Sequence, residues 1–120
     1  MYQGDCACAM RAHVTDSSVQ LIVTSPPYGA DKGYDVERTR EEYLAFTVEW
    51  LTEANRVLKP GCSAFVNIGY WCGSRSERWF MPGVLMEAAA QCDLVHCGWI
   101  NWVKDKKGTG RVLQKIHHIL

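Results

Sequence analysis

The residues best suited to chemistry are four consecutive ones, Ser25-Pro26-Pro27-Tyr28. They follow the apolar run Leu21-Ile22-Val23, which predicts a short strand buried on both faces, as found inside a parallel sheet. The two prolines lack a backbone N–H and fix φ, so they end the strand and stiffen the loop. The loop presents a hydroxyl, carbonyls with no competing N–H beside them, and an aromatic ring. Because ligands bind at the carboxyl edge of open α/β sheets, these groups predict a ligand site there.

A helix and a second strand follow in the order that a parallel sheet requires. The helix is predicted to be capped by Thr39 and to extend to Lys59, with apolar residues every three or four positions up to Leu58. Pro60-Gly61 is expected to stop this helix, and Ser63–Gly69 is predicted to be a second buried strand. Strand, helix and strand thus fall within about 50 residues, enough for a right-handed crossover between parallel strands.

Shorter elements complete the predicted sheet. Asp5 is a suitable N-cap for a short helix over residues 6–12. A second long helix is predicted over residues 81–92, and a third strand over residues 93–102. The last residues, 116–120, are predicted to form a short antiparallel strand. The chain is therefore expected to have an α/β fold with a mostly parallel sheet of about four strands, flanking helices and an antiparallel last strand.

Length and composition limit the classes of protein to consider. The 120 residues allow one domain, predicted over residues 1–120, and the 48% of hydrophobic residues argues against disorder. The formal net charge is zero, so any binding to nucleic acid must rest on local patches. With neither a long apolar run nor a signal-peptide pattern, a cytoplasmic protein without a membrane span is expected. The spacing of the six cysteines indicates free thiols and no metal site.

Three motifs in this order resemble the amino-methyltransferases of DNA. They are Gly4-Asp5-Cys6, the stretch from Leu21 to Tyr28, and the stretch from Ala54 to Gly61 before a strand. Enzymes of this family methylate the exocyclic N4 of cytosine or N6 of adenine. The resemblance implies a partial Rossmann-like methyltransferase fold, S-adenosylmethionine as cofactor and double-stranded DNA as partner.

The same resemblance implies roles for the four residues of the proline motif. An exocyclic amine is a poor nucleophile because its lone pair is delocalised into the base ring. Ser25 Oγ and the carbonyl of Pro26, fixed by Pro27, would accept hydrogen bonds from this amine, and Tyr28 would stack on a base flipped out of the duplex. Serine at the first motif position favours cytosine N4, and adenine N6 is the alternative.

Other residues have both a functional and a structural interpretation. The resemblance implies that Asp5, Thr24 and Asn67 line the cofactor site. Asp5 is equally well explained as a helix cap, and Asn67 as a strand-end residue. One basic cluster is a candidate for contacts with DNA phosphates, although such a run is also typical of a solvated loop. It contains Lys104, Lys106, Lys107 and Arg111.

The chain also departs from the family pattern. No glycine-rich cofactor loop and no target-recognition region can be identified, so the sequence corresponds to a catalytic half. The strand at Leu21–Val23 would then have one unpaired edge, which predicts a homodimer or a second, complementing polypeptide. An inactive remnant that binds DNA or a protein is the alternative function. An α/β fragment without a ligand is the remaining possibility.

Overall fold

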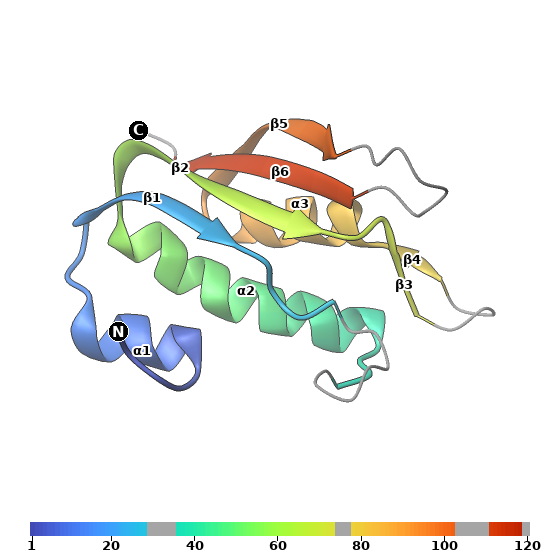
Figure 1. Cartoon of the computed structure of the whole chain (residues 1–120), viewed down its shortest axis with the longest axis horizontal. Coiled ribbons are helices and arrows are strands. Elements are labelled where there is room, and N and C mark those ends of the chain that lie inside the picture. The colour runs from blue at the N-terminus through green and yellow to red at the C-terminus, as the bar shows by residue number, and fades with distance from the viewer. Residues whose placement is uncertain (29–35, 74–77, 103–110, 119–120) are drawn as a thin grey trace.

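The computed structural model describes residues 1–28, 36–73, 78–102 and 111–118, with the backbone alone described for residues 102 and 111–118. Figure 1 shows the main sheet lying over α1 and α2. Among the described residues, no helix is long and apolar enough to cross a membrane. The elements in chain order are α1 (Cys6–His13), β1 (Val19–Thr24), α2 (Arg40–Val57), β2 (Leu58–Ile68), β3 (Trp71–Cys72), β4 (Trp79–Phe80), α3 (Met81–Gln91), β5 (Leu94–Trp102) and β6 (Arg111–His118).

The main sheet has four strands in the order β1-β2-β6-β5. β1 and β2 are parallel and are joined through α2, which confirms the predicted crossover. β6 is antiparallel to both of its neighbours, β2 and β5. The structure therefore confirms the predicted α/β class with an antiparallel last strand. The carboxyl ends of β1 and β2 meet at one edge of the sheet, where the proline motif begins.

Two predicted helix caps are confirmed. The Asp5 carboxylate accepts a hydrogen bond from the backbone N–H of Cys8 at 2.9 Å, at the start of α1. At the start of α2, Thr39 Oγ1 accepts from the N–H of Glu42 at 3.2 Å, and the Glu42 carboxylate accepts from the N–H of Thr39 at 2.8 Å. This reciprocal pair is a capping box, which fixes where α2 begins. The helix start in turn fixes the position of the residues that α2 presents to the sheet.

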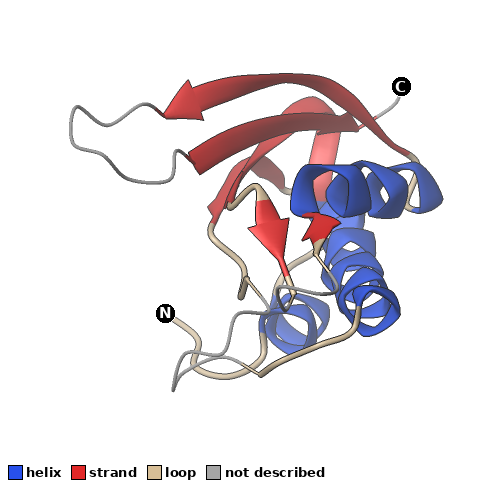
Figure 2. Cartoon of the chain, turned by 90° about the vertical axis from the view of Figure 1, so that its right-hand side faces the viewer, coloured by secondary structure: helices blue, strands red, loops and turns tan. Residues whose placement is uncertain are grey.

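The core lies between the helices and one face of the sheet. Alternate residues of β2 (Ala64, Val66 and Ile68) are at most 2% exposed and face α2 and α3. Leu51 of α2 and Leu85 of α3 pack in the same cluster. Figure 2 shows all the helices on this one side of the sheet.

The other side, here called the open face, is not covered by any described element. It is formed by alternate residues of all four strands, whose register places them in one surface. Among the residues whose side chains are described, its apolar members are Leu21 and Val23 of β1, Phe65 of β2, and Val95 and Ile100 of β5. The prediction that Leu21–Val23 would be buried on both faces is therefore wrong, since Leu21 is 55% and Val23 69% exposed.

Several element boundaries also differ from the predictions. α2 ends at Val57, and Leu58 already begins β2, because a residue before proline disfavours the helical region and Lys59 precedes Pro60. Between β2 and α3, β3 and β4 pair as a two-residue ladder that the sequence did not predict. The last strand begins at Arg111 rather than at residue 116.

Candidate functional site

The proline motif lies at the carboxyl end of β1, beside the carboxyl end of β2. Thr24 of β1 is in register with Val66 of β2, so the next residues, Ser25 and Asn67, are neighbours. Asn67 Nδ2 donates a hydrogen bond to Ser25 Oγ at 3.2 Å. The parallel register thus brings together two residues that are 42 positions apart in the sequence.

The Asn67 amide has a second polar atom that the described residues leave without a partner. Its Oδ1 is buried, and none of the described groups donates a hydrogen bond to it. Buried acceptors are rarely left unpaired, so this oxygen indicates a place for a donor that this part of the chain does not supply. A half-turn of the amide would exchange Nδ2 and Oδ1, so Asn67 can either donate to the Ser25 hydroxyl or accept from it.

Tyr43 of α2 holds the proline motif from the helix side of the sheet. Its Oη donates a hydrogen bond to the carbonyl oxygen of Pro27 at 2.7 Å, and its side chain is only 2% exposed. The Tyr43 ring packs against Trp79 with centroids 5.0 Å apart and against Phe46 at 5.9 Å. A buried tyrosine normally finds a partner for its hydroxyl, and here that partner is the backbone of the rigid loop. The proline motif is therefore held to the helix layer by a specific contact.

The remaining motif residues differ in exposure. Ser25 and Pro27 are exposed, whereas Pro26 and Tyr28 are half-buried. Tyr28 packs against the edge of the hydrophobic core. This packing restricts the orientation of the Tyr28 ring.

A cavity of about 520 Å³ lies between the start of α2 and the β3–β4 ladder. Trp79, which packs against Tyr43, also lines this cavity. The cavity therefore lies next to the aromatic cluster that holds the proline motif. Its charged lining is balanced, and its cations are in part already paired: Arg40 forms a salt bridge to Glu87. The lining residues are Glu37, Arg38, Thr39, Arg40, Glu41, Glu42, Gly73, Arg78 and Trp79.

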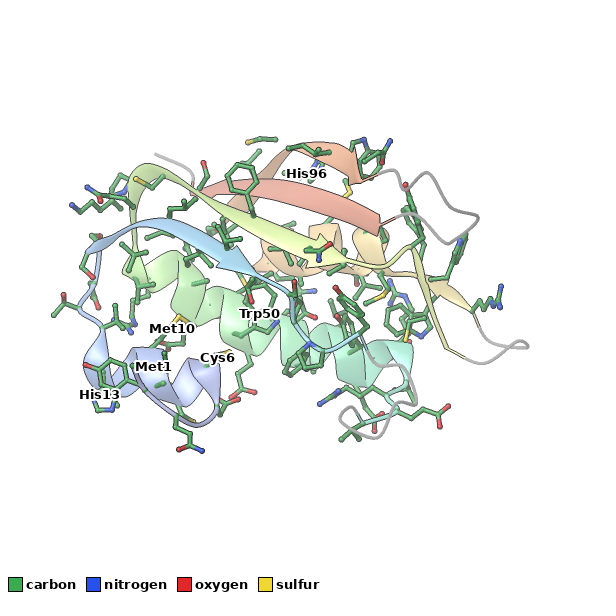
Figure 3. The ribbon with its side chains drawn as sticks, in the orientation of Figure 1. Met1, Cys6, Met10, His13, Trp50 and His96 are labelled. Carbon is green, nitrogen blue, oxygen red and sulfur yellow. The ribbon has the colours of Figure 1, made fainter. Side chains whose placement is uncertain are left out.

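Asp5 and Thr24, both predicted to line the cofactor site, occupy different surroundings. Asp5 is exposed, and the hydrogen bond from the Cys8 N–H holds the pKa of its carboxyl below the usual value. In Figure 3, Cys6 and His13 mark the two ends of α1, and the Cys6 end lies in the direction in which β1 runs. Asp5 is thus at the end of α1 nearer the carboxyl edge of the sheet. Thr24 is half-buried in β1 beside Val66.

The predicted basic cluster falls largely outside the described residues. Lys104, Lys106 and Lys107 belong to the part that the structure does not describe, and Arg111 is the first residue of β6, with its side chain not described. The six cysteines carry free thiols. Within the described ranges, no group of three or more His, Cys, Asp or Glu side chains is placed to hold a metal ion.

Comparison with protein families decides to which group this fold and motif belong. A family model for N6/N4 DNA methylases matches residues 19–117. The chain belongs to this DNA methylase family. It is also 42% identical to the type II methyltransferase M.BglII of Bacillus subtilis over 69 residues, which are 58% of this chain and 19% of M.BglII. The resemblance that the three motifs indicated is therefore confirmed.

Solved structures of methyltransferases share the fold of this DNA methylase chain. The PvuII cytosine-N4-specific DNA methyltransferase matches 98% of the chain with a TM-score of 0.79 at 18% identity, and 48% of that protein is covered. The Thermus thermophilus protein TTHA0409, solved in complex with S-adenosyl-L-methionine, matches 98% of the chain with a TM-score of 0.71 at 20% identity, and 52% of it is covered. The chain thus spans about half the length of these structures and about a fifth of M.BglII.

Sequence reasoning missed the role of Tyr43. It fits the apolar stripe predicted for α2, three residues before Phe46 and seven before Trp50, and that spacing alone explains an aromatic residue there. The signal that could have singled it out is chemical: a tyrosine on a core-facing stripe needs a partner for its hydroxyl, and the proline-rich loop offers carbonyls.

Proposed function

We propose that this chain carries the target-base side of an active site that transfers a methyl group from S-adenosylmethionine to an exocyclic amine of a DNA base. Cytosine N4 is the favoured target and adenine N6 the second candidate. The observation that carries the proposal is the contact between Asn67 Nδ2 and Ser25 Oγ at the carboxyl edge of the parallel strands. It places an oriented hydroxyl on a rigid loop, in a family that methylates DNA.

Hydrogen-bond acceptors are the main requirement of this chemistry. Ser25 Oγ and the carbonyl of Pro26 accept hydrogen bonds from the two N–H groups of the amine, which draws the lone pair out of conjugation with the ring. The donor, when bound, would supply the methyl group as its C–S bond breaks with the electron pair going to sulfur. The methylated nitrogen would then lose one proton to water. The loop supplies rate through fixed positions rather than through a strong base.

Asn67 and Tyr43 are positioning residues in this proposal. Asn67 holds the Ser25 hydroxyl: its Nδ2 donates to one lone pair of Ser25 Oγ, and the other lone pair is free to accept. Tyr43 fixes the loop through the Pro27 carbonyl. Tyr28 supplies a ring on which the flipped base can stack. Flipping costs a few kcal/mol, and stacking is worth about 1–3 kcal/mol, so one ring offsets much of that cost.

S-adenosylmethionine, when bound, supplies the methyl group as an electrophile. The buried and unpartnered Oδ1 of Asn67 fits a donor from outside the described residues, and Asp5 presents an exposed carboxylate near the same edge. Thr24 would contribute only from its half-buried place in β1. These three residues form one side of a cofactor site, and the glycine-rich side must come from additional polypeptide.

The choice of cytosine N4 rests on Ser25, since serine is the residue that the family often carries at this position in cytosine enzymes. Contacts to DNA phosphates by Lys104, Lys106, Lys107 and Arg111 are part of the same proposal. A second candidate function is an inactive remnant that binds DNA or a protein.

A chimera tests the proposal. In full-length M.BglII, the matched segment is replaced by this chain, and methyl transfer to DNA is measured with labelled S-adenosylmethionine. Mass spectrometry of the nucleosides distinguishes N4-methylcytosine from N6-methyladenine. Because Ser25 is the proposed acceptor, we expect Ser25→Ala to reduce transfer by about 100-fold or more. The matched control is Ser18→Ala, at the opposite end of β1, whose hydroxyl donates to the carbonyl of Thr15; its transfer rate should stay unchanged.

Each outcome of this experiment has a definite meaning. Undiminished transfer by the Ser25→Ala chimera would refute the proposed role of the hydroxyl. Methylation of adenine alone would overturn the choice of base and leave the role of Ser25 intact. A folded chimera that binds neither cofactor nor methylates DNA, while the chain still binds DNA, would favour the inactive remnant.

A further inference from the structure

The short ladder of β3 and β4 has an inner and an outer face. Cys72 is paired in register with Trp79, and Trp71 with Phe80, so strand alternation puts the two pairs on opposite faces. The inner pair belongs to the core: Cys72 is 5% exposed, and Trp79 packs against Tyr43. In the outer pair, Trp71 is 61% and Phe80 is 37% exposed. The ladder therefore turns two large aromatic side chains toward the solvent.

The outer pair is held in place by its surroundings. The ring centroids of Trp71 and Phe80 are 5.5 Å apart, with the planes tilted by 56°. The Phe80 ring lies against the first turn of α3, where Gly83 leaves room for it: a Cβ on Gly83 would be 3.4 Å from Phe80 Cδ1. The backbone N–H of Met81 donates to the carbonyl oxygen of Tyr70 at 3.0 Å and so ties the start of α3 to β3. Little freedom of the two rings is left to be lost on binding.

The position of the ladder connects it to the proline motif. In Figure 1, β3 and β4 extend beyond the carboxyl end of β2, on the side toward which β1 also runs. Trp79 on the inner face contacts Tyr43, whose hydroxyl holds the Pro27 carbonyl. Arg78, directly before β4, is exposed and forms no ion pair within the described part of the chain. Aromatic rings and a cation thus lie together beside the proposed target-base site.

We propose that Trp71 and Phe80 stack on the face of a base that is exposed when the target nucleotide leaves the duplex, while Arg78 contacts a neighbouring phosphate. The inference rests on the proposed function, because it takes DNA with a flipped base as the substrate. Flipping breaks the stack on both sides of the target. Aromatic side chains stack on any base, since every base has a π-face, and apolar side chains inserted between base steps hold the stack open. This subsite is separate from Tyr28, the ring proposed for the target base itself.

A protein partner or a second copy of the chain fits the outer pair less well. An aromatic side chain buries at most about 250 Å², so the two rings supply at most about 500 Å². A stable protein interface needs about 800 Å² from each partner. The cavity next to the ladder does not enlarge the apolar surface, because most of its lining residues are charged. A single base with its phosphate matches both the size of the aromatic surface and the cation beside it.

The test measures binding of the full chain to DNA and does not depend on methyl transfer. Two short duplexes differ at one nucleotide: one is intact, and the other has an abasic site, so that the bases beside it expose a face. 2-Aminopurine next to this position reports stacking, because its fluorescence falls when a ring stacks on it. At low salt, we expect the chain to bind the abasic duplex at least about tenfold more tightly than the intact one, and to quench the probe.

Variants separate the rings from the cation. Trp71→Ala should remove both the preference for the abasic duplex and the quenching, whereas Trp71→Phe should keep part of each. Arg78→Ala should weaken binding to both duplexes by a similar factor, because a phosphate contact does not depend on the bases. Tyr2→Ala is the matched control and should bind as the wild type does. Tyr2 is also 61% exposed, but it stacks on His13, which lies at the opposite end of the molecule in Figure 3. Thermal unfolding shows that each variant is folded.

Four results would overturn the proposal. They are equal affinity of the wild-type chain for the two duplexes, binding to neither duplex, a folded Trp71→Ala chain that keeps the preference, and a self-associated wild-type chain that Trp71→Ala converts to monomers. In the last case the occupant of the outer pair would be a second copy. Ser25→Ala should bind both duplexes as the wild type does. The stacking role can therefore fail while the role of Ser25 holds, and the methyl-transfer experiment can fail while the stacking role holds.

Discussion

The two faces of the sheet show how differently the same strands can be used. On the covered face, Ala64, Val66 and Ile68 of β2 pack under α2 and α3 and are almost fully buried. On the open face, Leu21 and Val23 of β1 are as apolar as a core but more than half exposed. The stability of the isolated chain must therefore come from the covered face, while the open face contributes only after something binds to it.

The largest expected effect is the loss of a core leucine on the covered face. Leu51 of α2 is 0% exposed, so Leu51→Ala should reduce the free energy of unfolding by about 2–5 kcal/mol through lost burial and a cavity. The matched variant on the open face is Leu21→Ala, where the same atoms are removed from a side chain that is 55% exposed. We expect that change to cost less than about 1 kcal/mol in the isolated chain. Urea unfolding of both variants measures the difference.

Equal losses for the two variants would contradict the contrast between the faces. They would show that Leu21 is already buried in solution, for example by self-association. Sedimentation of the wild-type chain at the concentration of the unfolding experiment serves as the control.

Much of the covered face could be predicted from the sequence. The caps at Asp5 and Thr39 and the spacing of apolar residues in α2 are local signals, and local signals survive in the structure. The proline motif predicted a rigid loop after a strand, since proline acts on its own backbone and on the residue before it. The order of motifs indicated the family, which the match over residues 19–117 confirms.

The parts that were missed depend on contacts between distant residues. Burial of Leu21 and Val23 is decided by what lies over β1, and no pattern within the strand distinguishes an interior position from an uncovered one. The hydrogen bond from Tyr43 to Pro27 joins residues 16 positions apart through the packing of α2. The early end of α2 has a local cause instead. Pro60 was expected to stop the helix only after Lys59, but a proline also disfavours the helical conformation of the residue before it, so the helix ends earlier. The exposure of Leu21 and Val23 and the contact of Tyr43 were decided by long-range packing.

The second prediction concerns the charge network that fastens α1 to α2 on the covered side. Glu53 is 7% exposed and accepts hydrogen bonds from Arg56 at 2.8 Å and from Arg11 at 3.2 Å. The hydrogen bond from Arg56 is the main reason that the pKa of the Glu53 carboxyl lies below its usual value of 4.5. A carboxyl with a lowered pKa in the folded state stabilises the fold above its unfolded pKa, and this contribution is lost as the pH falls through the folded pKa.

Glu53→Gln isolates that contribution. At pH 7 we expect the variant to have a Tm lower than the wild type by roughly 5 °C, because a charged partner of Arg56 and Arg11 is lost. As the pH falls below the usual glutamate value, the gap between the two proteins should close. Thermal unfolding of both proteins from pH 7 to pH 3 measures this difference in Tm. The other carboxyls are common to both proteins, so their titration cancels in the difference. A gap that stays constant with pH would show that Glu53 acts through packing alone. No comparable network exists among the described side chains of the open face, so its variants should show no such dependence.

The smallest expected effect links the covered face to the proline motif. Tyr43→Phe keeps the ring between Trp79 and Phe46 but removes the hydroxyl that donates to the Pro27 carbonyl. We expect a loss of about 0.5–1.5 kcal/mol in the free energy of unfolding, the usual net value of one hydrogen bond. Tyr70→Phe is the matched control, since the Tyr70 hydroxyl donates to the exposed Asn101 side chain at 3.1 Å, where water can replace the partner. Its cost should stay below about 0.5 kcal/mol.

In the chimera with M.BglII, Tyr43→Phe should also lower methyl transfer by more than its effect on stability explains, because the loop that carries Ser25 is less firmly held. If transfer falls only in proportion to the folded fraction, Tyr43 supports the fold and does not position the motif.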